Sequence, residues 1–176
     1  MIIRMRTIIM PATELASSTI VEGMLGHRLA PLLRRSWHHL NQIFRHRISE
    51  HGLTPDQFTV LRWLNEARGI SQRHLAELMA VDENTIASLV ARMEDSGLIE
   101  RRGHASDGRR KVLEASPTGE AVFRRIQPIA TDLQDKLMSS IPKAERAGFL
   151  LNLARIAEAG CQTAQREKAV RRARRR

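Results

Sequence analysis

Apolar residues recur at the spacing of one helical face along most of the chain, so the sequence predicts a mainly α-helical protein. Between positions 29 and 48 they fall three or four residues apart, at Leu29, Leu32, Leu33, Trp37, Leu40, Ile43, Phe44 and Ile48. Gly52 suits the end of this first helix, Thr54 the cap of the next, and Pro55 its first turn. We expect the second helix to end near Gly69.

The middle of the chain predicts two short helices followed by two strands. Ser71 suits the N-cap of "SQRHLAELM", and Asp82 opens a further helix with apolar Ile86, Leu89, Val90 and Met93 that ends at Gly97. The segments "LIERRG" and "RRKVLEAS" resemble brief strands joined by "HASDG", in which Asp107-Gly108 is a strong turn signal.

Two more helices complete the predicted order. One begins at Ser116-Pro117 and continues to about Ser139, with Pro128 expected to kink it. The last is expected to open at Pro142 and to end near Gly160. Its apolar positions are Phe149, Leu150, Leu153, Ile156 and Ala157.

Composition fits this helical picture. The 176 residues suit one domain, or two small ones that share a core, and the hydrophobic fraction of 42% is ordinary for a globular protein. Aromatic residues are scarce, with two Trp, four Phe and no Tyr, so aliphatic side chains must do most of the packing.

The formal net charge of +10 is unevenly distributed and indicates a polyanionic partner such as DNA. The tail "REKAVRRARRR" holds seven basic residues and one acidic one, a composition typical of a solvated, disordered arm. A second concentration lies in the predicted hairpin, at Arg101, Arg102, Arg109, Arg110 and Lys111.

Location is predicted from three absences in the sequence. Cys161 is the single cysteine, so no intrachain disulfide is expected. No apolar stretch has the length of a secretory signal or of a membrane span. We expect a cytoplasmic protein with no membrane partner, and an N-terminal arm over about residues 1–28.

Two short helices, a tight turn and a basic hairpin in this order predict a winged helix-turn-helix that reads the major groove of duplex DNA. Asn84, Thr85 and Ser88 are expected to face base edges, because the apolar stripe of their helix faces the core. Arg92, Ser71 and Gln72 are expected to reach phosphates. In the wing, Arg102, Arg109 and Arg110 are the expected DNA contacts, with Arg109 at the tip and Asp107 holding an arginine in place.

Each of these assignments has a plainer alternative. Asn84, Thr85 and Ser88 also suit helix capping or a solvated helix face. The wing arginines also suit a solvated hairpin.

Residues 29–159 resemble the MarR (multiple-antibiotic-resistance regulator) family of bacterial transcription factors. The resemblance is carried by "LTPDQFTVLRWL", "SQRHLAELMAVDENTIASLVARMEDSGLIERR" and "ASDGRRKVLEASPTGE". The family pattern of Asp-x-Arg, a strand and Leu-Thr-x-x-Gly is matched at Asp107, Arg109 and Gly119. It departs at Ala115-Ser116, which still supplies a hydroxyl cap.

The resemblance implies a mainly α fold, a winged helix-turn-helix with N- and C-terminal dimerisation helices. The dimerisation region falls at 29–52 and 117–160, the DNA-binding lobe at 53–116, and the basic tail at 161–176. It further implies a homodimer on a palindromic operator, with repression as the default. Two recognition helices then lie about 34–36 Å apart.

The resemblance also implies a small-molecule effector between the dimerisation helices and the DNA-binding lobe. Carried onto this chain, the expected effector residues are Trp37, His38, Asn41, Phe44, Phe58 and Arg62. An aromatic wall with a few polar groups suits an aromatic carboxylate or its coenzyme A thioester. Ordinary core packing of Trp37, Phe44 and Phe58, and a surface position for His38, are the alternatives.

Three other functions are weighed against this one. A redox-responsive regulator is disfavoured, because Cys161 lies past the last predicted helix without a resolving partner. The histidines at 38, 39, 46 and 51 lack the spacing of a metal site, and no catalytic motif is present, so we expect no cofactor and no enzymatic activity. A nonspecific DNA-packaging protein is favoured only by the basic tail.

Overall fold

The computed structural model describes residues 28–67, 69–104 and 107–174; within these ranges the side chains of 104, 107–110 and 168 are not described. Contacts divide the chain into two compact units, 1–43 and 44–176, and the boundary falls inside the first described helix. The arm predicted over residues 1–28 lies outside the described residues, except for Arg28.

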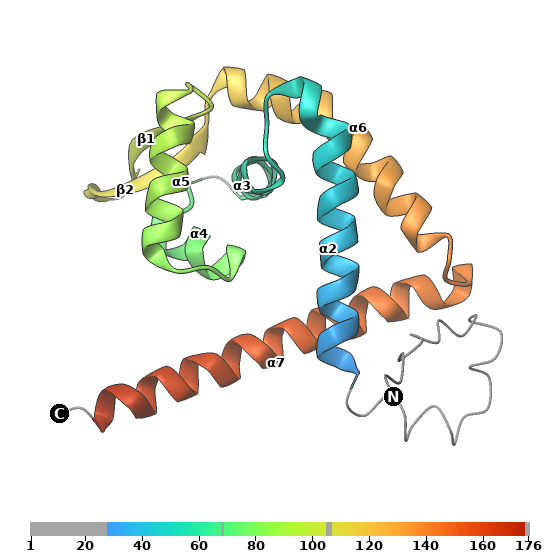
Figure 1. Ribbon diagram of the computed structural model, residues 1–176. Helices are drawn as coiled ribbons and strands as arrows, with labels where there is room; N and C mark the ends of the chain where they lie inside the picture. Colours follow the sequence, from blue (N-terminus) through green and yellow to red (C-terminus); the bar gives the residue numbers. More distant parts are fainter. Residues whose placement is uncertain (1–27, 68, 105–106, 175–176) are drawn as a thin grey trace, which may run out of the picture. The chain divides into compact units, whose positions relative to one another are not determined.

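The fold is mainly helical, as the periodicity predicts. The chain forms, in order, α2 (Leu29–Ile48), the 3-10 turn η2 (Ser49–His51), α3 (Pro55–Glu66), α4 (Gln72–Met79), α5 (Glu83–Asp95), β1 (Ile99–His104), β2 (Asp107–Ala115), α6 (Pro117–Met138), the 3-10 turn η3 (Lys143–Glu145) and α7 (Arg146–Ala173) (Figure 1). The helix α3 ends three residues before Gly69, and α6 continues through Pro128.

Side-chain caps fix where the helices of the second unit begin. The Thr54 hydroxyl accepts a hydrogen bond from the Gln57 N–H, and the Gln57 side chain accepts one from the Thr54 N–H, which completes a capping box at α3. Ser71 caps α4 and Asp82 caps α5. The predicted N-caps Thr54, Ser71 and Asp82 are therefore confirmed.

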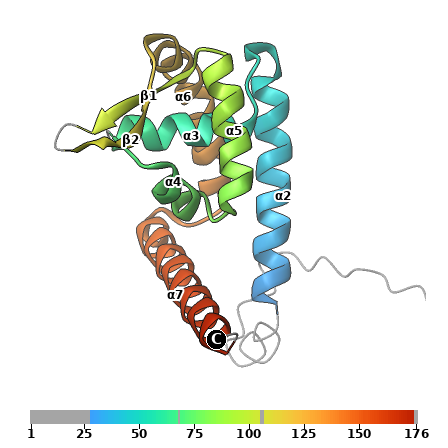
Figure 2. The same ribbon diagram turned by 90° about the vertical axis from the view of Figure 1, so that its left-hand side faces the viewer.

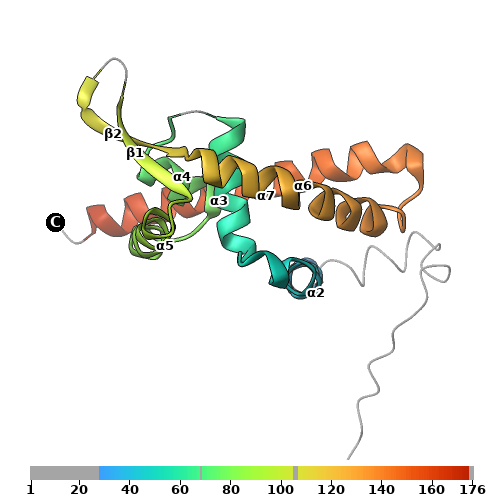
Figure 3. The same cartoon turned by 90° about the horizontal axis from the view of Figure 1, so that it is seen from above.

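Strands β1 and β2 form one antiparallel hairpin that projects from the helices of its unit (Figures 2 and 3). The pairing runs from Ile99 opposite Ala115 to His104 opposite Asp107, with an irregularity between Gly103 and His104. The turn predicted at Asp107-Gly108 is wrong, because β2 already begins at Asp107. Cross-strand pairing, which a dipeptide signal does not include, sets the register.

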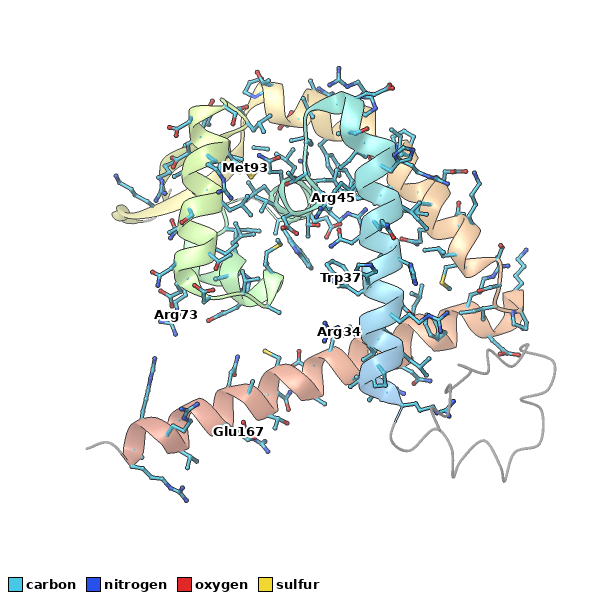
Figure 4. All side chains as sticks on the ribbon, viewed as in Figure 1. Arg34, Trp37, Arg45, Arg73, Met93 and Glu167 are labelled. Carbon is cyan, nitrogen blue, oxygen red and sulfur yellow. The ribbon has the colours of Figure 1, made fainter. Side chains whose placement is uncertain are left out.

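The core of the second unit lies where α3, α4, α5, α6 and the hairpin meet. Its fully buried side chains come from these elements and from the last residue of α2, and they are Ile48, Val60, Leu61, Leu75, Ile86, Val90, Met93, Leu113 and Ile126. In Figure 4 Met93 points from α5 into this interior. The apolar stripe predicted for α5 is therefore confirmed as core.

The hairpin is joined tightly to the start of α6. The Ser116 N–H donates to the Leu98 carbonyl, and the Ser116 hydroxyl donates to the Gly97 carbonyl at 2.5 Å while accepting from the Gly119 N–H at 3.0 Å. A methyl group at Gly119 would overlap the carbonyl of Leu98. Only glycine fits this contact without a shift of the backbone.

The helix α7 is longer than the sequence predicts. Pro142 precedes the turn η3, and the helix itself begins at Arg146. The stop predicted at Gly160 is wrong, because α7 continues to Ala173. A glycine inside a helix costs only about 1 kcal/mol, and the residues that follow it include the strong helix formers Ala, Gln, Glu, Lys and Arg. In the parts of the chain that the structure describes, no helix is long and apolar enough to cross a membrane.

Candidate nucleic-acid interface

The helix α5 presents a polar face to solvent. Its N-terminal half carries Asn84, Thr85 and Ser88, all exposed, on the side opposite buried Ile86 and Leu89. The helices α4 and α5 pack together across a short turn in which Ala80 adopts a left-handed conformation with φ 53°. These two helices and the hairpin form a winged helix-turn-helix, and α5 is in the position of its recognition helix.

Hydrogen bonds within α5 limit what its hydroxyl groups can offer to a base. The Thr85 hydroxyl donates to the Asp82 carboxylate at 2.5 Å, and the Ser88 hydroxyl donates to the Asn84 carbonyl at 3.1 Å. Each hydroxyl oxygen keeps acceptor capacity, and both residues are exposed, so acceptance from a base amino group stays a prediction. The capping role that was the alternative for Thr85 is therefore observed. Its hydroxyl oxygen can still accept a hydrogen bond while the hydroxyl donates to Asp82.

The start of α5 is negatively charged. The backbone N–H groups of Asn84 and Thr85 donate to Asp82 at 3.0 and 2.9 Å. The side-chain hydrogen bond from Thr85, followed by the one from its backbone, lowers the pKa of Asp82 below its ordinary value. A carboxylate here repels phosphates, so this end of α5 is suited to base edges, where an acidic group accepts from cytosine N4.

Cationic and polar groups flank the polar face of α5. Arg92 is exposed one turn further along, and among the described residues it makes no ion pair. Ser71 is exposed at the start of α4, where its hydroxyl accepts from the His74 N–H at 3.2 Å, and Gln72 beside it is half-buried. Arg73 points away from α4 in Figure 4, and its exposed side chain pairs with Glu77 at 3.5 Å.

The two arginines of β1 both pair with carboxylates of the same lobe. Arg102 lies 3.0 Å from Glu100 and 3.4 Å from Glu114, and the hydrogen bond that Arg102 donates to Glu100 is the main cause of its raised pKa. The DNA contact of Arg102 stays a prediction. Glu100 and Glu114 would compete with a phosphate for its guanidinium. Lys111 on β2 is exposed.

Arg101 makes a contact that the sequence does not predict. Its Nε–H donates to both carboxylate oxygens of Glu94, each at 2.9 Å. Since Glu94 lies in the last turn of α5, this pair ties the hairpin to the recognition helix. The partners are seven residues apart on either side of Gly97, where the chain reverses with φ 66°.

The predicted tip of the wing is described only in its backbone. Asp107, Arg109 and Arg110 lie in β2, and their side chains are outside the described parts of the structure. Their DNA contacts therefore stay predictions from the sequence.

Two of the predicted effector residues lie in the hydrophobic core. Phe58 is 3% exposed and Phe44 is 9% exposed. The two rings meet edge to face with 5.1 Å between their centres, and the Phe58 ring also stacks on that of Phe123 with 5.3 Å between centres. Both rings therefore pack as ordinary core residues, which is the alternative to an effector contact. Arg62 is half-buried, with its guanidinium carbon 5.2 Å from the centre of the Phe58 ring.

The remaining predicted effector residues belong to the first unit. Trp37, labelled on α2 in Figure 4, is 57% exposed; His38 is exposed and Asn41 is half-buried. A surface position for His38 is therefore what the structure shows. Among the described residues, His, Cys, Asp and Glu do not gather in any group of three that could hold a metal.

A small polar hollow of about 200 Å³ lies at the base of the hairpin, and none of the predicted effector residues lines it. It is bounded by Leu64, Asn65, Arg102, Glu114, Ala115, Pro117 and Glu120. Arg102 is already paired with Glu114 there, and Glu120 adds a second carboxylate, so the lining does not suit an anionic ligand.

Comparison with known proteins agrees with this geometry. The family model described as "MarR family" matches residues 51–110, the segment that forms α3, α4, α5 and most of the hairpin. The putative transcriptional regulatory protein for the hcr operon of Thauera aromatica is 30% identical over 135 residues, which cover 76% of this chain and 81% of that protein.

Solved structures of two regulators share the fold. The transcriptional repressor CouR bound to a 23-mer DNA duplex is 28% identical, with a TM-score of 0.65 over 76% of this chain and 96% of that one. CouR from Rhodococcus jostii RHA1 has also been solved with p-coumaroyl-CoA, at 25% identity and a TM-score of 0.69 over 76% and 94%. PcaV from Streptomyces coelicolor, in complex with its natural ligand, is 28% identical, with a TM-score of 0.67 over 77% and 96%.

Proposed function

Because the chain belongs to the MarR family of transcriptional regulators, we propose that it binds a palindromic DNA operator as a homodimer. It acts as a repressor, and a small aromatic acid or its coenzyme A thioester releases it from the operator. The observation that carries the proposal is the exposed polar face of α5 beside a basic hairpin.

Base readout and phosphate contact are divided between different residues in this proposal. Asn84, Thr85 and Ser88 read base edges from α5, because they are short, polar and exposed. Arg92, Arg109 and Arg110 contact the sugar–phosphate backbone, which fixes the position of α5 in the groove. A sequence-specific regulator needs both sets, whereas a DNA-packaging protein needs only the cations.

The test of this division uses an operator obtained by selection from random duplexes. Binding to that operator and to a scrambled duplex is measured by fluorescence anisotropy, and we expect a preference of roughly 10³–10⁷ for the operator. Asn84→Ala is expected to lower the preference by about 1–3 kcal/mol, and Arg92→Ala to weaken both duplexes equally. If Asn84→Ala lost the same affinity for the operator as for the scrambled duplex, base readout by Asn84 would be refuted.

Exposed apolar side chains support the homodimer. In the first unit they lie on α2, at Leu29, Leu32, Leu33, Trp37 and Ile43. In the second unit they lie on α7, at Phe149, Leu150, Leu151 and Ile156. Clusters of exposed large apolar side chains on a helix are typical of a protein–protein interface. In a two-fold dimer both helices have a partner copy to cover them.

For the effector we propose that Arg62 binds the carboxylate of the ligand. The residue is half-buried, its guanidinium carbon lies 5.2 Å from the centre of the Phe58 ring, and it makes no ion pair with a described residue. A partly buried cation beside an aromatic ring fits an anionic aromatic molecule. The solved complex of CouR with p-coumaroyl-CoA supports this class, and the PcaV complex supports a bound ligand in general. Trp37, His38 and Asn41 stay predicted effector contacts from the resemblance.

A thermal-shift screen of aromatic acids and their coenzyme A thioesters tests the effector class. A ligand at 100 times its dissociation constant stabilises the protein by about 2.7 kcal/mol. We expect Arg62→Gln to abolish the shift for the active acid, while operator binding without ligand persists. A shift of equal size in Arg62→Gln would remove Arg62 from the site.

A further inference from the structure

The C-terminal part of α7 is a basic helix against which no other described part of the chain packs. From Ala154 to Arg174 every described side chain is exposed, and the segment from Cys161 to Ala173 is helical (Figure 1). The segment begins beyond residues 29–159, which carry the family resemblance. It contributes nothing to the core and needs an explanation of its own.

Its positive charge is not neutralised within the described chain. Arg166, Arg171, Arg172 and Arg174 are exposed, and within the described ranges none of them pairs with a carboxylate. Glu167 is the single acidic residue after Gly160, and Figure 4 shows it on the surface of α7. Lys168, Arg175 and Arg176 add further positive charge in the sequence.

The helix dipole accounts for only part of this arrangement. Cations in the last turn of a helix gain about 0.3–1 kcal/mol each from the negative end of the dipole. That effect applies to Arg171, Arg172 and Arg174 and not to Arg166, which lies two turns before the end. Cations this close also repel one another, so the cluster favours an external anion.

The distribution of the arginines identifies the kind of anion. Steps of about 100° per residue spread Arg166, Arg171, Arg172 and Arg174 over about 240° of the helix circumference, which is more than one face. A single binding groove would select one face. Phosphates of a DNA backbone accept cations from any direction without sequence preference.

A membrane surface is a poorer partner for this segment. A helix that lies on a bilayer needs a continuous face of large apolar residues. The segment from Cys161 to Arg174 offers only Val170 as a large aliphatic side chain, and the other apolar residues are Cys161 and three alanines.

We propose that the basic end of α7, defined by Arg166, Arg171, Arg172 and Arg174, binds the DNA backbone outside the operator. The inference rests on the proposed function, because it adds a contact to a protein already bound to duplex DNA. Thirteen helical residues span about 20 Å, which corresponds to about six base pairs. The contact raises affinity for all duplexes and leaves the operator preference unchanged.

The experiment compares the full chain with two matched variants. The neutral variant carries Arg166→Gln, Arg171→Gln, Arg172→Gln and Arg174→Gln, and the control variant carries lysine at the same four positions. Glutamine and lysine have helix propensities close to that of arginine, and circular dichroism checks that helix content is kept. Binding is measured on roughly 20- and 40-base-pair duplexes, each with the operator or a scrambled centre, between about 50 and 200 mM salt.

We expect the neutral variant to lose affinity on the longer duplexes, on the order of tenfold for operator and scrambled DNA alike. Its plot of log affinity against log salt should become shallower by about 0.9 for each phosphate that an arginine no longer neutralises. The lysine variant should behave like the full chain. On the short duplexes the neutral variant should differ much less, because the flanking phosphates are missing.

Three results would overturn the inference. The first is an unchanged salt slope in the neutral variant. The second is a loss of affinity for operator duplexes only. The third is binding to phosphatidylserine vesicles that depends on the four arginines, with no change in affinity for DNA. If the full chain fails to prefer the operator over scrambled DNA, the proposed function itself is wrong. If that preference persists and the slope is unchanged, only the role of α7 is wrong.

Discussion

The Nε atom of Arg101 lies 2.9 Å from both carboxylate oxygens of Glu94, so strand β1 is tied to the last turn of the recognition helix α5. The pair is only partly exposed, at 35% and 28% for the two side chains. We infer that it sets the position of the wing relative to α5.

Glu94→Gln separates positioning from simple charge. The substitution removes a negative charge near DNA, so charge alone predicts tighter binding to every duplex. The pairing predicts instead that the operator preference falls by about two- to fivefold, because a partly exposed pair contributes at most about 1 kcal/mol.

The charge swap completes this test as a double-mutant cycle measured on operator and scrambled duplexes. Arg101→Glu and Glu94→Arg each break the pair, and the double variant restores it with the charges exchanged. If the double variant loses as much operator preference as the two single variants together, the pair has no positioning role.

Gly119 provides a test of the joint between hairpin and helix. A side chain there overlaps the Leu98 carbonyl, so Gly119→Ala is expected to lower the free energy of unfolding by about 1–3 kcal/mol. Gly160→Ala is the matched control, because a methyl group there meets nothing within 4 Å and should stabilise α7 by about 0.5–1 kcal/mol. Urea unfolding measures the free energy of unfolding of both variants. An unchanged value for Gly119→Ala would show that the backbone shifts at this contact without cost.

The cap of α5 makes a prediction about pH. The Thr85 hydrogen bonds lower the pKa of Asp82 below its ordinary value of 3.8. A carboxyl group with a lowered pKa stabilises the folded state above its unfolded pKa, and this contribution is lost as the pH falls through the folded pKa. An NMR titration should show Thr85→Val raising the pKa of Asp82, whereas Thr85→Ser keeps it low. An Asp82 pKa that is the same in Thr85→Val as in the native chain would show that the hydroxyl does not hold the cap.

The exposed apolar face of α7 predicts the oligomeric state. Leu150 is 45% exposed, and Leu150→Asp should shift sedimentation from dimer towards monomer, because a carboxylate is costly to bury in an apolar interface. Arg155→Glu is the control, since it changes charge at an exposed position about 140° around the same helix from Leu150. A Leu150→Asp protein that stays fully dimeric would exclude this face from the interface.

The helices and their caps can be predicted from the sequence because their causes are local. Thr54, Ser71, Asp82 and Ser116 each bond to a backbone N–H within three residues, so the short sequence around each cap already contains both partners. The apolar period likewise identifies the core side of α5.

Features that depend on pairing or on distant packing cannot be predicted in this way. The sequence places the hairpin turn at Asp107-Gly108, where β2 has already begun, because strand pairing decides the register. The Glu94–Arg101 pair requires the chain reversal at Gly97 to bring two side chains together. Charge alone predicts a disordered tail, whereas the alanines and arginines of this segment continue α7 to Ala173.

The most direct test of the central claim is selection of DNA by the full chain from a library of random duplexes. A winged helix-turn-helix dimer that reads bases through α5 should enrich a palindrome whose half-sites are about 10–10.5 base pairs apart, centre to centre. Recovery of unrelated sequences, with affinity that depends on salt and not on sequence, would contradict the account.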